Sequence, residues 1–535
     1  MKENLPANVK RYARFLLAMA GLGGLLYGID VGVIAAALPY IEKTSNYSSQ
    51  QLSFVVSAVL FGSVLSSLFA GAMAEWLGRK KVILLSALCF TLSIPVICAS
   101  VLFQNGFLCL TLGRILQGAS AGLVGVVVPM YLAECLDADS RGKGTGMFQL
   151  LLTIGLVFAA VIGLAVTYLV GASDDMAVSA ASKTTAWQTI FWCSSIPGLI
   201  LFFGAFKLKE SPRWLYKTGV KFENRAEKLK SFVLDGEKYM KTGGFDPVAV
   251  FAKEKNSLYR CIERAEKYKA EALKALAANN GEEKAKEILA EMIAADEAAA
   301  AEKAKNAAAT DSLLQRKYVI PFLLAVVVLA CTQATGVNSA LNYSVKIFQQ
   351  AGFQGAFANW ADLGFKIVNV VMTLVAVALV DKKGRTFLLK VGTSGIICGL
   401  SIVGTTFLAL HRGWIAPSLT SGLVVMAGFV VFMAFYAVGP GVCVWLALSE
   451  LMPNRIRANG MSIALLINQG VSTTIASTFL PWADKFGYES VFFTLAAFTV
   501  VYLITAAFFM PETKGRTLEE IEQYFKTGKM PERNA

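Results

Sequence analysis

Twelve apolar stretches, each long enough to cross a lipid bilayer, constrain this 535-residue sequence more than any other feature. A membrane span needs roughly 20 mostly apolar residues. The stretches lie near 15–37, 52–73, 82–103, 107–131, 146–170, 187–207, 319–348, 360–380, 387–409, 419–447, 460–480 and 490–510. Because backbone groups in lipid must hydrogen-bond within the protein, each stretch is predicted to be a helix. The sequence therefore predicts an all-α membrane protein with twelve transmembrane helices.

Charged residues are few, and they are distributed unevenly. Only 16% of the chain is charged, whereas a soluble protein carries about 25%. Of the 87 ionisable acidic and basic residues, 39 lie between 210 and 317. The segment 213–316 is rich in Ala, Glu and Lys, which are strong helix formers. We therefore expect a charged helical insert between two apolar halves, either as a solvated spacer or as a partner-binding or regulatory segment.

The ends of the apolar halves and of the charged insert divide the chain into four parts. We predict an N-terminal six-helix half (1–207), a cytoplasmic linker and helical insert (208–317), a C-terminal six-helix half (318–510) and a cytoplasmic tail (511–535).

Basic clusters occupy every second connection between the apolar stretches. They comprise Lys10, Arg11 and Arg14; Arg79 to Lys81; Arg141 and Lys143; Lys382, Lys383 and Arg385; Arg455 and Arg457; and Lys514 and Arg516. Positive charge concentrates on the cytoplasmic side of membrane proteins, so both termini are predicted to be cytoplasmic. The net charge of +13 is thereby explained by topology, and we do not expect a nucleic-acid partner.

The first six stretches resemble the last six. Gly78-Arg79 recurs as Gly384-Arg385, 306 residues later. Glu134 and Arg141 recur as Glu450 and Arg457, and Glu210-Ser211 recurs as Glu512-Thr513, at offsets of 316 and 302 residues. Three matched loops at nearly one offset predict two parallel six-helix halves with a substrate site between them.

Several motifs together identify a family. They are Gly24-Leu25-Leu26-Tyr27-Gly28-Ile29-Asp30, the loop ending Gly78-Arg79-Lys80, Gly113-Arg114, Pro129 to Glu134, Glu210-Ser211-Pro212-Arg213-Trp214, Gly439-Pro440-Gly441 with Trp445, and Pro511 to Glu520. The chain resembles a sugar porter of the major facilitator superfamily, from about Gly21 to Phe525 apart from the insert. The resemblance implies transport of a sugar or polyol by alternating access.

The resemblance also implies which residues bind the substrate. The family's sugar-binding positions fall on Gln149, Gln333, Asn338, Asn369, Trp445 and Asn468. Amides both donate and accept hydrogen bonds, as sugar hydroxyls require. Polar amides inside apolar spans must face the protein interior or a cavity, so the alternative is that they only hold helices together.

The sequence departs from the family near this site. Thr332-Gln333 stands where a Gln-Gln pair is usual, Asn342-Tyr343 replaces an aromatic pair, and Gln469 replaces an aromatic residue. We expect a more polar cavity and an altered outer gate. A polyol, an inositol, a pentose and a modified sugar all remain open as substrates.

Asp30 and Arg114 are ionisable residues inside spans. Intramembrane charges are costly and mark functional sites. Proton-coupled members of the family carry an acid at the Asp30 position, so we expect proton symport through Asp30 with Arg114 as its partner. The alternatives are a static ion pair and a facilitative uniporter.

The charged loops at the cytoplasmic side resemble the family's inner salt-bridge network, with Glu75 paired to Arg79, Glu134 to Arg141, Asp381 to Arg385 and Glu450 to Arg457. Its expected members are Glu75, Arg79, Glu134, Arg141, Glu210, Asp381, Arg385, Glu450, Arg457 and Glu512. Such a network would hold the two halves together in the outward-open state and break on opening inward.

Other function classes fit the sequence poorly. The one histidine, His411, lies in an outside loop, and the nine cysteines are scattered. No catalytic triad, phosphate loop or metal-ligand cluster is present, so we expect neither an enzyme nor a cofactor. A non-transporting sugar sensor is the main rival, while a channel and a drug/proton antiporter fit less well. We expect a monomer in the cell membrane, the inner membrane in a bacterium.

Overall fold

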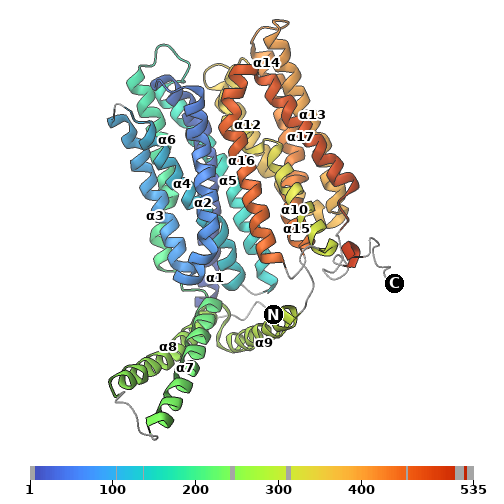
Figure 1. Cartoon of the computed structure of the whole chain (residues 1–535). Helices are drawn as coiled ribbons and strands as arrows, with labels where there is room; N and C mark the ends of the chain where they lie inside the picture. The colour runs from blue at the N-terminus through green and yellow to red at the C-terminus, as the bar shows by residue number, and fades with distance from the viewer. Residues whose placement is uncertain are drawn as a thin grey trace.

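A computed structural model of the chain describes residues 7–103, 105–135, 138–240, 248–308, 315–452, 456–512 and 523–526. Within these ranges the secondary structure is helical, without a strand. Eleven helical stretches are long and apolar enough to cross a membrane. Two bundles of helices stand side by side, and a group of polar helices extends from one end (Figure 1). We call this the insert end and the opposite end the far end.

The N-terminal bundle contains six long helices. They are α1 (Ala7–Thr44), α2 (Ser49–Leu77), α3 (Arg79–Cys98, continued by the 3-10 turn η1, Ala99–Leu102), α4 (Phe107–Cys135), α5 (Ala138–Val170) and α6 (Ala180–Phe206). Helix α1 packs along α5, and α4 packs between α2 and α3. Each helix covers one of the first six predicted stretches, so the six-helix prediction for this part of the chain is confirmed.

Glycines let these helices approach backbone to backbone, as expected for packing in lipid. A Cβ added to Gly28 of α1 would lie 1.9 Å from the carbonyl oxygen of Leu152 on α5. Helices α2 and α4 approach each other as closely. A Cβ added to Gly118 of α4 would lie 2.0 Å from the carbonyl oxygen of Val59 on α2. The α1–α5 and α2–α4 pairs therefore have little room for side chains at these positions.

The C-terminal bundle contains eight helices that cover the last six predicted stretches. They are α10 (Arg316–Ala334), α11 (Val337–Gln350), α12 (Phe357–Lys383), α13 (Arg385–His411), α14 (Leu419–Val438), α15 (Pro440–Leu451), α16 (Arg457–Phe486) and α17 (Tyr488–Phe508).

Two of the predicted spans are each broken into two helices, which their apolar length alone did not predict. The stretch 319–348 is interrupted at Gly336, whose φ of 81° is left-handed, and 419–447 is interrupted between Gly439 and Pro440. Glycine adopts a left-handed φ without steric cost, and proline begins a helix but cannot continue one. Discontinuous helices of this kind leave backbone groups and polar side chains available in transporters.

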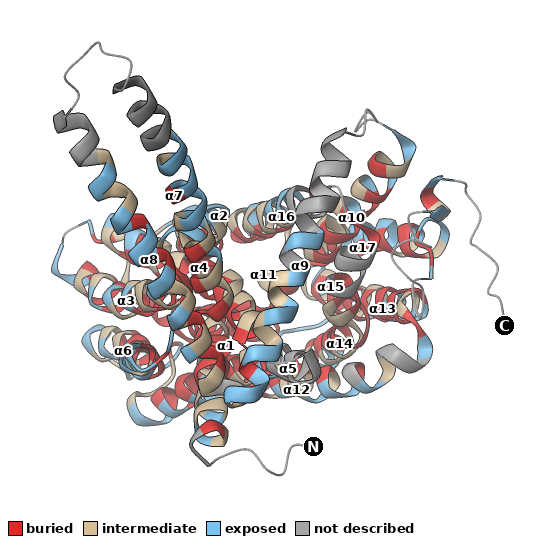
Figure 2. Ribbon diagram, turned by 90° about the horizontal axis from the view of Figure 1, so that it is seen from below, coloured by how far each residue is buried: buried red, intermediate tan, exposed pale blue. Residues whose placement is uncertain are grey.

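The insert forms three helices, α7 (Pro212–Met240), α8 (Val248–Asn280) and α9 (Glu282–Ala308). Helices α7 and α8 form a hairpin that projects from the insert end of the N-terminal bundle (Figure 1). A small apolar core of Leu215, Ala272 and Ala275, flanked by Trp214 and Tyr268, joins them at their base. Seen from below, α9 runs beneath the bundles rather than beside the hairpin (Figure 2).

The two bundles are joined by polar contacts at the far end. Lys346 of α11 forms an ion pair with Glu42 of α1 at 2.8 Å. Asn359 of α12 donates to Thr167 of α5 at 3.1 Å. Tyr343 of α11 donates to Ser53 of α2 at 3.3 Å, and Gln349 donates to Ser173 at 3.1 Å. These contacts close the far end between the bundles.

Candidate functional site

Three of the predicted substrate-binding amides form one hydrogen-bonded chain in the C-terminal bundle. The Asn338 amide donates to Gln333 Oε1 at 3.0 Å, and the Gln333 amide donates to Asn468 Oδ1 at 3.2 Å. Asn468 in turn donates to the carbonyl oxygen of Leu329 at 2.8 Å. Gln333 and Asn338 flank the break at Gly336, so the interruption between α10 and α11 places them against α16.

Two further polar contacts lie next to this cluster in the chain, and the sequence motifs predicted neither. Ser472, one helical turn beyond Asn468 on α16, accepts a second hydrogen bond from Asn338 at 2.7 Å. Thr332 donates to the hydroxyl group of Tyr502 on α17 at 2.9 Å. The i, i+4 spacing of Asn468 and Ser472 is a sequence signal for the first contact, whereas the second joins distant spans and leaves no local signal.

The remaining predicted substrate positions lie on other helices. Asn369 is buried on α12 and Gln149 is half-buried on α5. Trp445 falls on α15, but its side chain lies outside the described residues. Gln469, which replaces a family aromatic, lies beside the Tyr27 hydroxyl group across the two bundles. The structure thus groups Gln333, Asn338 and Asn468 directly and places the other three on separate elements.

Asp30 and Arg114 are both buried in the N-terminal bundle, but they do not form the direct ion pair that we predicted. The Arg114 Nη1 atom donates to Gln117 Oε1 at 2.6 Å, and its guanidinium carbon lies 5.9 Å from the centre of the Phe191 ring. Neither carboxyl oxygen of Asp30 has a hydrogen-bond partner among the described residues. Gln117, one turn from Arg114 on the same helix, takes the place of the carboxylate.

A second buried acid–base pair lies in the C-terminal bundle, where the sequence reading proposed none. Lys366 Nζ contacts Asp362 Oδ2 at 2.8 Å, and both side chains are at most 1% exposed. The hydroxyl group of Ser344 on α11 donates to the other carboxylate oxygen of Asp362 at 2.6 Å. The i, i+4 spacing of opposite charges within one apolar stretch is the signal that could have identified the pair.

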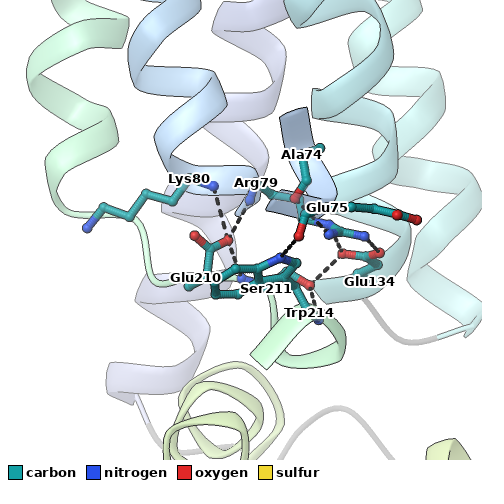
Figure 3. A network of polar contacts seen from close by, with 8 residues as sticks. All are labelled: Ala74, Glu75, Arg79, Lys80, Glu134, Glu210, Ser211 and Trp214. Atoms are coloured by element: carbon teal, nitrogen blue, oxygen red, sulfur yellow. Dashed lines mark hydrogen bonds and ion pairs between the residues drawn. The ribbon is translucent and has the colours of Figure 1, made fainter. Parts of the chain in front are cut away.

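At the insert end, Arg79 pairs with Glu134 rather than with the predicted Glu75. The Arg79 Nη2 and Nε atoms donate to the two Glu134 oxygens at 2.7 and 2.8 Å (Figure 3). A bidentate pair of this geometry is stronger than a single contact. Glu75 contributes only its backbone oxygen, which accepts from the Trp214 indole at 2.8 Å. Arg79 is the first residue of α3, and its guanidinium group lies against the end of α4. It therefore contacts Glu134 rather than Glu75.

Glu210 caps the N-terminus of α3. Its Oε1 atom accepts from the backbone N–H groups of Arg79 at 2.8 Å, Lys80 at 3.1 Å and Ser211 at 2.9 Å (Figure 3). Carboxylates are stabilised at helix N-termini by the unpaired N–H groups and the helix dipole. Burial nevertheless raises the pKa of the Glu210 carboxyl above its ordinary value, although these hydrogen bonds oppose the shift.

The C-terminal bundle repeats this cap. Glu512 accepts from the backbone N–H groups of Arg385 at 3.0 Å and Thr386 at 3.1 Å. The preceding glycines match, with φ values of 95° at Gly78 and 89° at Gly384. A Cβ on either glycine would meet the capping carboxylate at 2.3 or 2.6 Å. The internal repeat seen in the sequence therefore extends to the geometry of both loops.

The other predicted gate residues are only partly described. The side chains of Arg141, Asp381, Glu450 and Arg457 lie outside the described residues. The contacts given above for Arg79, Glu134, Glu210 and Glu512 each lie within one bundle. A latch between the bundles at the insert end accordingly stays a prediction.

Comparison with known proteins decides the family. The model of the family described as "Sugar (and other) transporter" matches residues 16–257 and 260–525. The chain belongs to this family. A D-xylose transporter of Levilactobacillus brevis is 30% identical over 511 residues, which cover 95% of this chain and 94% of that protein. A galactose-proton symporter of Escherichia coli is 28% identical over 516 residues, covering 96% and 95%.

The major myo-inositol transporter IolT of Bacillus subtilis is 27% identical over 530 residues, covering 98% of this chain and 96% of that protein. Among solved structures, the inward-open conformation of the xylose transporter XylE from Escherichia coli superimposes with a TM-score of 0.71 at 22% identity. The match covers 95% of this chain and 98% of that one. The chain is thus a multi-pass membrane protein with the major facilitator fold.

Proposed function

We propose that the protein carries a neutral sugar or polyol across the cell membrane by alternating access between its two bundles. The chain of amides formed by Gln333, Asn338 and Asn468 is the observation that supports this most. Each amide offers both donors and acceptors, which a polyhydroxylated ligand needs and an apolar drug does not. The relatives named for xylose, galactose and myo-inositol transport fit the same substrate class.

In this proposal the substrate contacts both bundles. Gln149 of α5 supplies the contact from the N-terminal bundle, while Asn369 and Trp445 add to the amide chain from the C-terminal bundle. Thr332, which stands where the family usually has a glutamine, is bonded to Tyr502 and so leaves Gln333 as the amide available on α10. With this difference, the proposed substrate is a polyol, an inositol, a pentose or a modified sugar rather than plain glucose.

Asp30 couples transport to protons in this proposal. An ionised carboxylate without a partner is very costly in an apolar interior. Both Asp30 oxygens are buried without a hydrogen-bond partner, which suits a neutral, protonated acid. The far end is closed by contacts such as the Lys346–Glu42 ion pair. The arrangement therefore fits a state with Asp30 protonated and the far end closed, before proton release.

The proposed orientation places the insert end and both termini in the cytoplasm. The basic clusters of the sequence support this direction. Glu75, Arg79, Glu134, Arg141, Glu210, Asp381, Arg385, Glu450, Arg457 and Glu512 would then form the cytoplasmic gate. The boundaries at 207, 317 and 510 would separate the halves, the insert and the tail of a monomeric carrier.

Uptake of labelled sugars into proteoliposomes, with and without an inward proton gradient, tests the proposal. We expect accumulation above the external concentration when the outside is acidic, and only equilibration without the gradient. Asp30→Asn should abolish gradient-driven accumulation while leaving sugar exchange intact. Accumulation that persists unchanged in Asp30→Asn would refute the coupling, and equilibration by wild-type protein regardless of the gradient would identify a uniporter.

The rival sensor function is supported by the three-helix insert, which is long for a connecting loop. A sensor would bind a sugar but not exchange it. Thermal stabilisation of the purified protein by a panel of sugars identifies the ligand, because a ligand that binds only the folded state stabilises it by mass action. Stabilisation without counterflow would favour the sensor over the transporter.

A further inference from the structure

Three buried polar side chains lie together in the middle of the N-terminal bundle. Asp30 of α1 and Gln117 of α4 are 0% exposed, and Arg114 is 1% exposed. Arg114 and Gln117 are one helical turn apart, so their side chains lie on the same face of α4. The Gln117 side-chain oxygen accepts a hydrogen bond from Arg114 at 2.6 Å, which is the polar contact made by the guanidinium group in this structure.

The same three side chains also have unused polar atoms. Both Asp30 oxygens, the Gln117 amide nitrogen and the Arg114 Nε atom lack hydrogen-bond partners within the described part of the chain. One acceptor group and two donors are therefore left over, side by side in an apolar interior. A buried polar group without a partner is costly, so a second arrangement, in which the Arg114 guanidinium turns to the Asp30 carboxylate, is accessible.

We propose that Gln117 is a positioning residue that holds Arg114 while Asp30 is protonated, and releases it to Asp30 when the proton leaves. In the second arrangement, the Arg114 guanidinium leaves the Gln117 side-chain oxygen and donates to the Asp30 carboxylate. This inference rests on the proposed coupling role of Asp30. It assigns a role to a residue that neither the sequence motifs nor the comparisons single out.

The exchange follows from the relative strengths of the two contacts. The guanidinium is cationic in both contacts, but the Gln117 oxygen is neutral whereas an ionised Asp30 carries a full negative charge, so the attraction to Asp30 is stronger once the proton has left. Gln117 therefore keeps Arg114 only while Asp30 is neutral. By offering a substitute acceptor, Gln117 lowers the cost of separating Arg114 from the acid, and so it favours proton uptake by Asp30.

Few other groups compete for this exchange. Among the described residues, Arg114 and Tyr27 are the titratable groups that act on Asp30. Helix α6 contributes the Phe191 ring beneath the guanidinium, and α5 contributes the backbone of Leu152 beside Gly28. Neither neighbour can accept a proton or replace the amide of Gln117.

Infrared difference spectroscopy of the purified protein tests the role without requiring transport. The carbonyl band of the protonated Asp30 is assigned by its loss in Asp30→Asn and followed as a function of pH. In Gln117→Leu, Arg114 has no substitute acceptor, so we expect the midpoint pH of the band to fall by about one unit, a tenfold loss of proton affinity. Thr111→Val is the matched control, since Thr111 is another buried polar residue without a partner on α4, and its midpoint should equal that of the wild type.

The outcomes separate this inference from the coupling proposal. A midpoint shift in Gln117→Leu supports the role of Gln117 even if wild-type uptake proves independent of the proton gradient. An unchanged midpoint in a folded Gln117→Leu protein overturns it, as does the absence of a titrating Asp30 band in the wild type. If Gln117→Leu cannot be purified, Gln117→Met, which keeps the side-chain length without the amide, decides between the same two results.

Discussion

Each bundle buries an acid and a base within the membrane, but the two sites differ in how their polar atoms are satisfied. In the C-terminal bundle, Asp362 contacts Lys366 at 2.8 Å and accepts from Ser344 at 2.6 Å. In the N-terminal bundle, Arg114 contacts Gln117, and Asp30 has no hydrogen-bond partner among the residues that the structure describes.

The difference indicates which site is structural and which is mechanistic. Both pairs lose their hydration, and a buried pair offsets that loss only when its geometry and additional hydrogen bonds are good. The Asp362–Lys366 pair has both, so any rearrangement would break contacts that nothing replaces. The Asp30 site has unsatisfied donors beside an acid and therefore a second accessible arrangement. Buried charge alone does not identify a coupling site; unsatisfied partners do.

Neutralising Asp30 should have the largest effect on transport. Asp30→Asn is expected to abolish proton-driven sugar accumulation, because the group that carries the proton is gone. Its thermal stability should stay near that of the wild type, since Asp30 contributes no hydrogen bond to the fold. Uptake under an imposed pH gradient and the melting temperature in detergent measure the two quantities. A large fall in the melting temperature would mean that Asp30 is structural after all.

Removing one partner of the C-terminal pair should have the opposite signature. Lys366→Met leaves the Asp362 carboxylate buried without its cation, which typically costs about 3–5 kcal/mol. We expect strongly reduced thermal stability but, in the protein that remains folded, an unchanged dependence of uptake on the gradient. Asp362→Asn combined with Lys366→Met removes both charges and should recover most of the stability. A double variant as unstable as the single one would show that packing, not charge, is responsible.

The helix that carries Asp30 offers a test of intermediate size. A side chain at Gly28 would lie 1.9 Å from the Leu152 carbonyl oxygen, so Gly28→Val should force α1 away from α5. Overpacking of this kind usually costs about 1–3 kcal/mol. Gly71→Val is the control, because no atom lies within 4 Å of a Cβ at that position. Equal melting temperatures for the two variants would contradict the close α1–α5 packing.

The smallest expected effect concerns the capping carboxylates at the insert end. Burial raises the pKa of Glu210 above 4.5 in the folded protein. The folded chain then takes up a proton at a higher pH than the unfolded chain, so this group adds stability as pH falls through its raised pKa toward 4.5. Glu210→Gln should remove that pH dependence while retaining an oxygen acceptor for the α3 cap.

Melting temperatures between pH 4 and 7 would measure this effect, with Glu512→Gln as the matched change in the other bundle. The slope of stability with pH should flatten in Glu210→Gln relative to the wild type. If stability changes with pH equally steeply in Glu210→Gln and in the wild type, Glu210 does not contribute to the pH dependence.

Local sequence signals were enough to predict the helical class and the six-helix repeat, whereas the amides of the C-terminal cluster were selected by the family resemblance. The breaks at Gly336 and between Gly439 and Pro440 were missed because apolar length alone does not register a backbone turn. Arg114 contacts Gln117 rather than Asp30 in this structure because Gln117 lies one turn away on the same helix, a local contact that charge complementarity did not predict. Ser344 could not have been assigned to Asp362, because their contact depends on the direction that α11 takes after the break at Gly336.

The hydrogen bond from Trp214 to the Glu75 backbone fastens the base of α7 to the N-terminal bundle. Helix α7 has 29 residues, so at 1.5 Å per residue it is a lever about 43 Å long, and a bundle rotation of about 10° would sweep its tip through about 7 Å. A pair of fluorophores on that tip and on the other bundle would therefore magnify the rocking motion enough to follow single transport cycles.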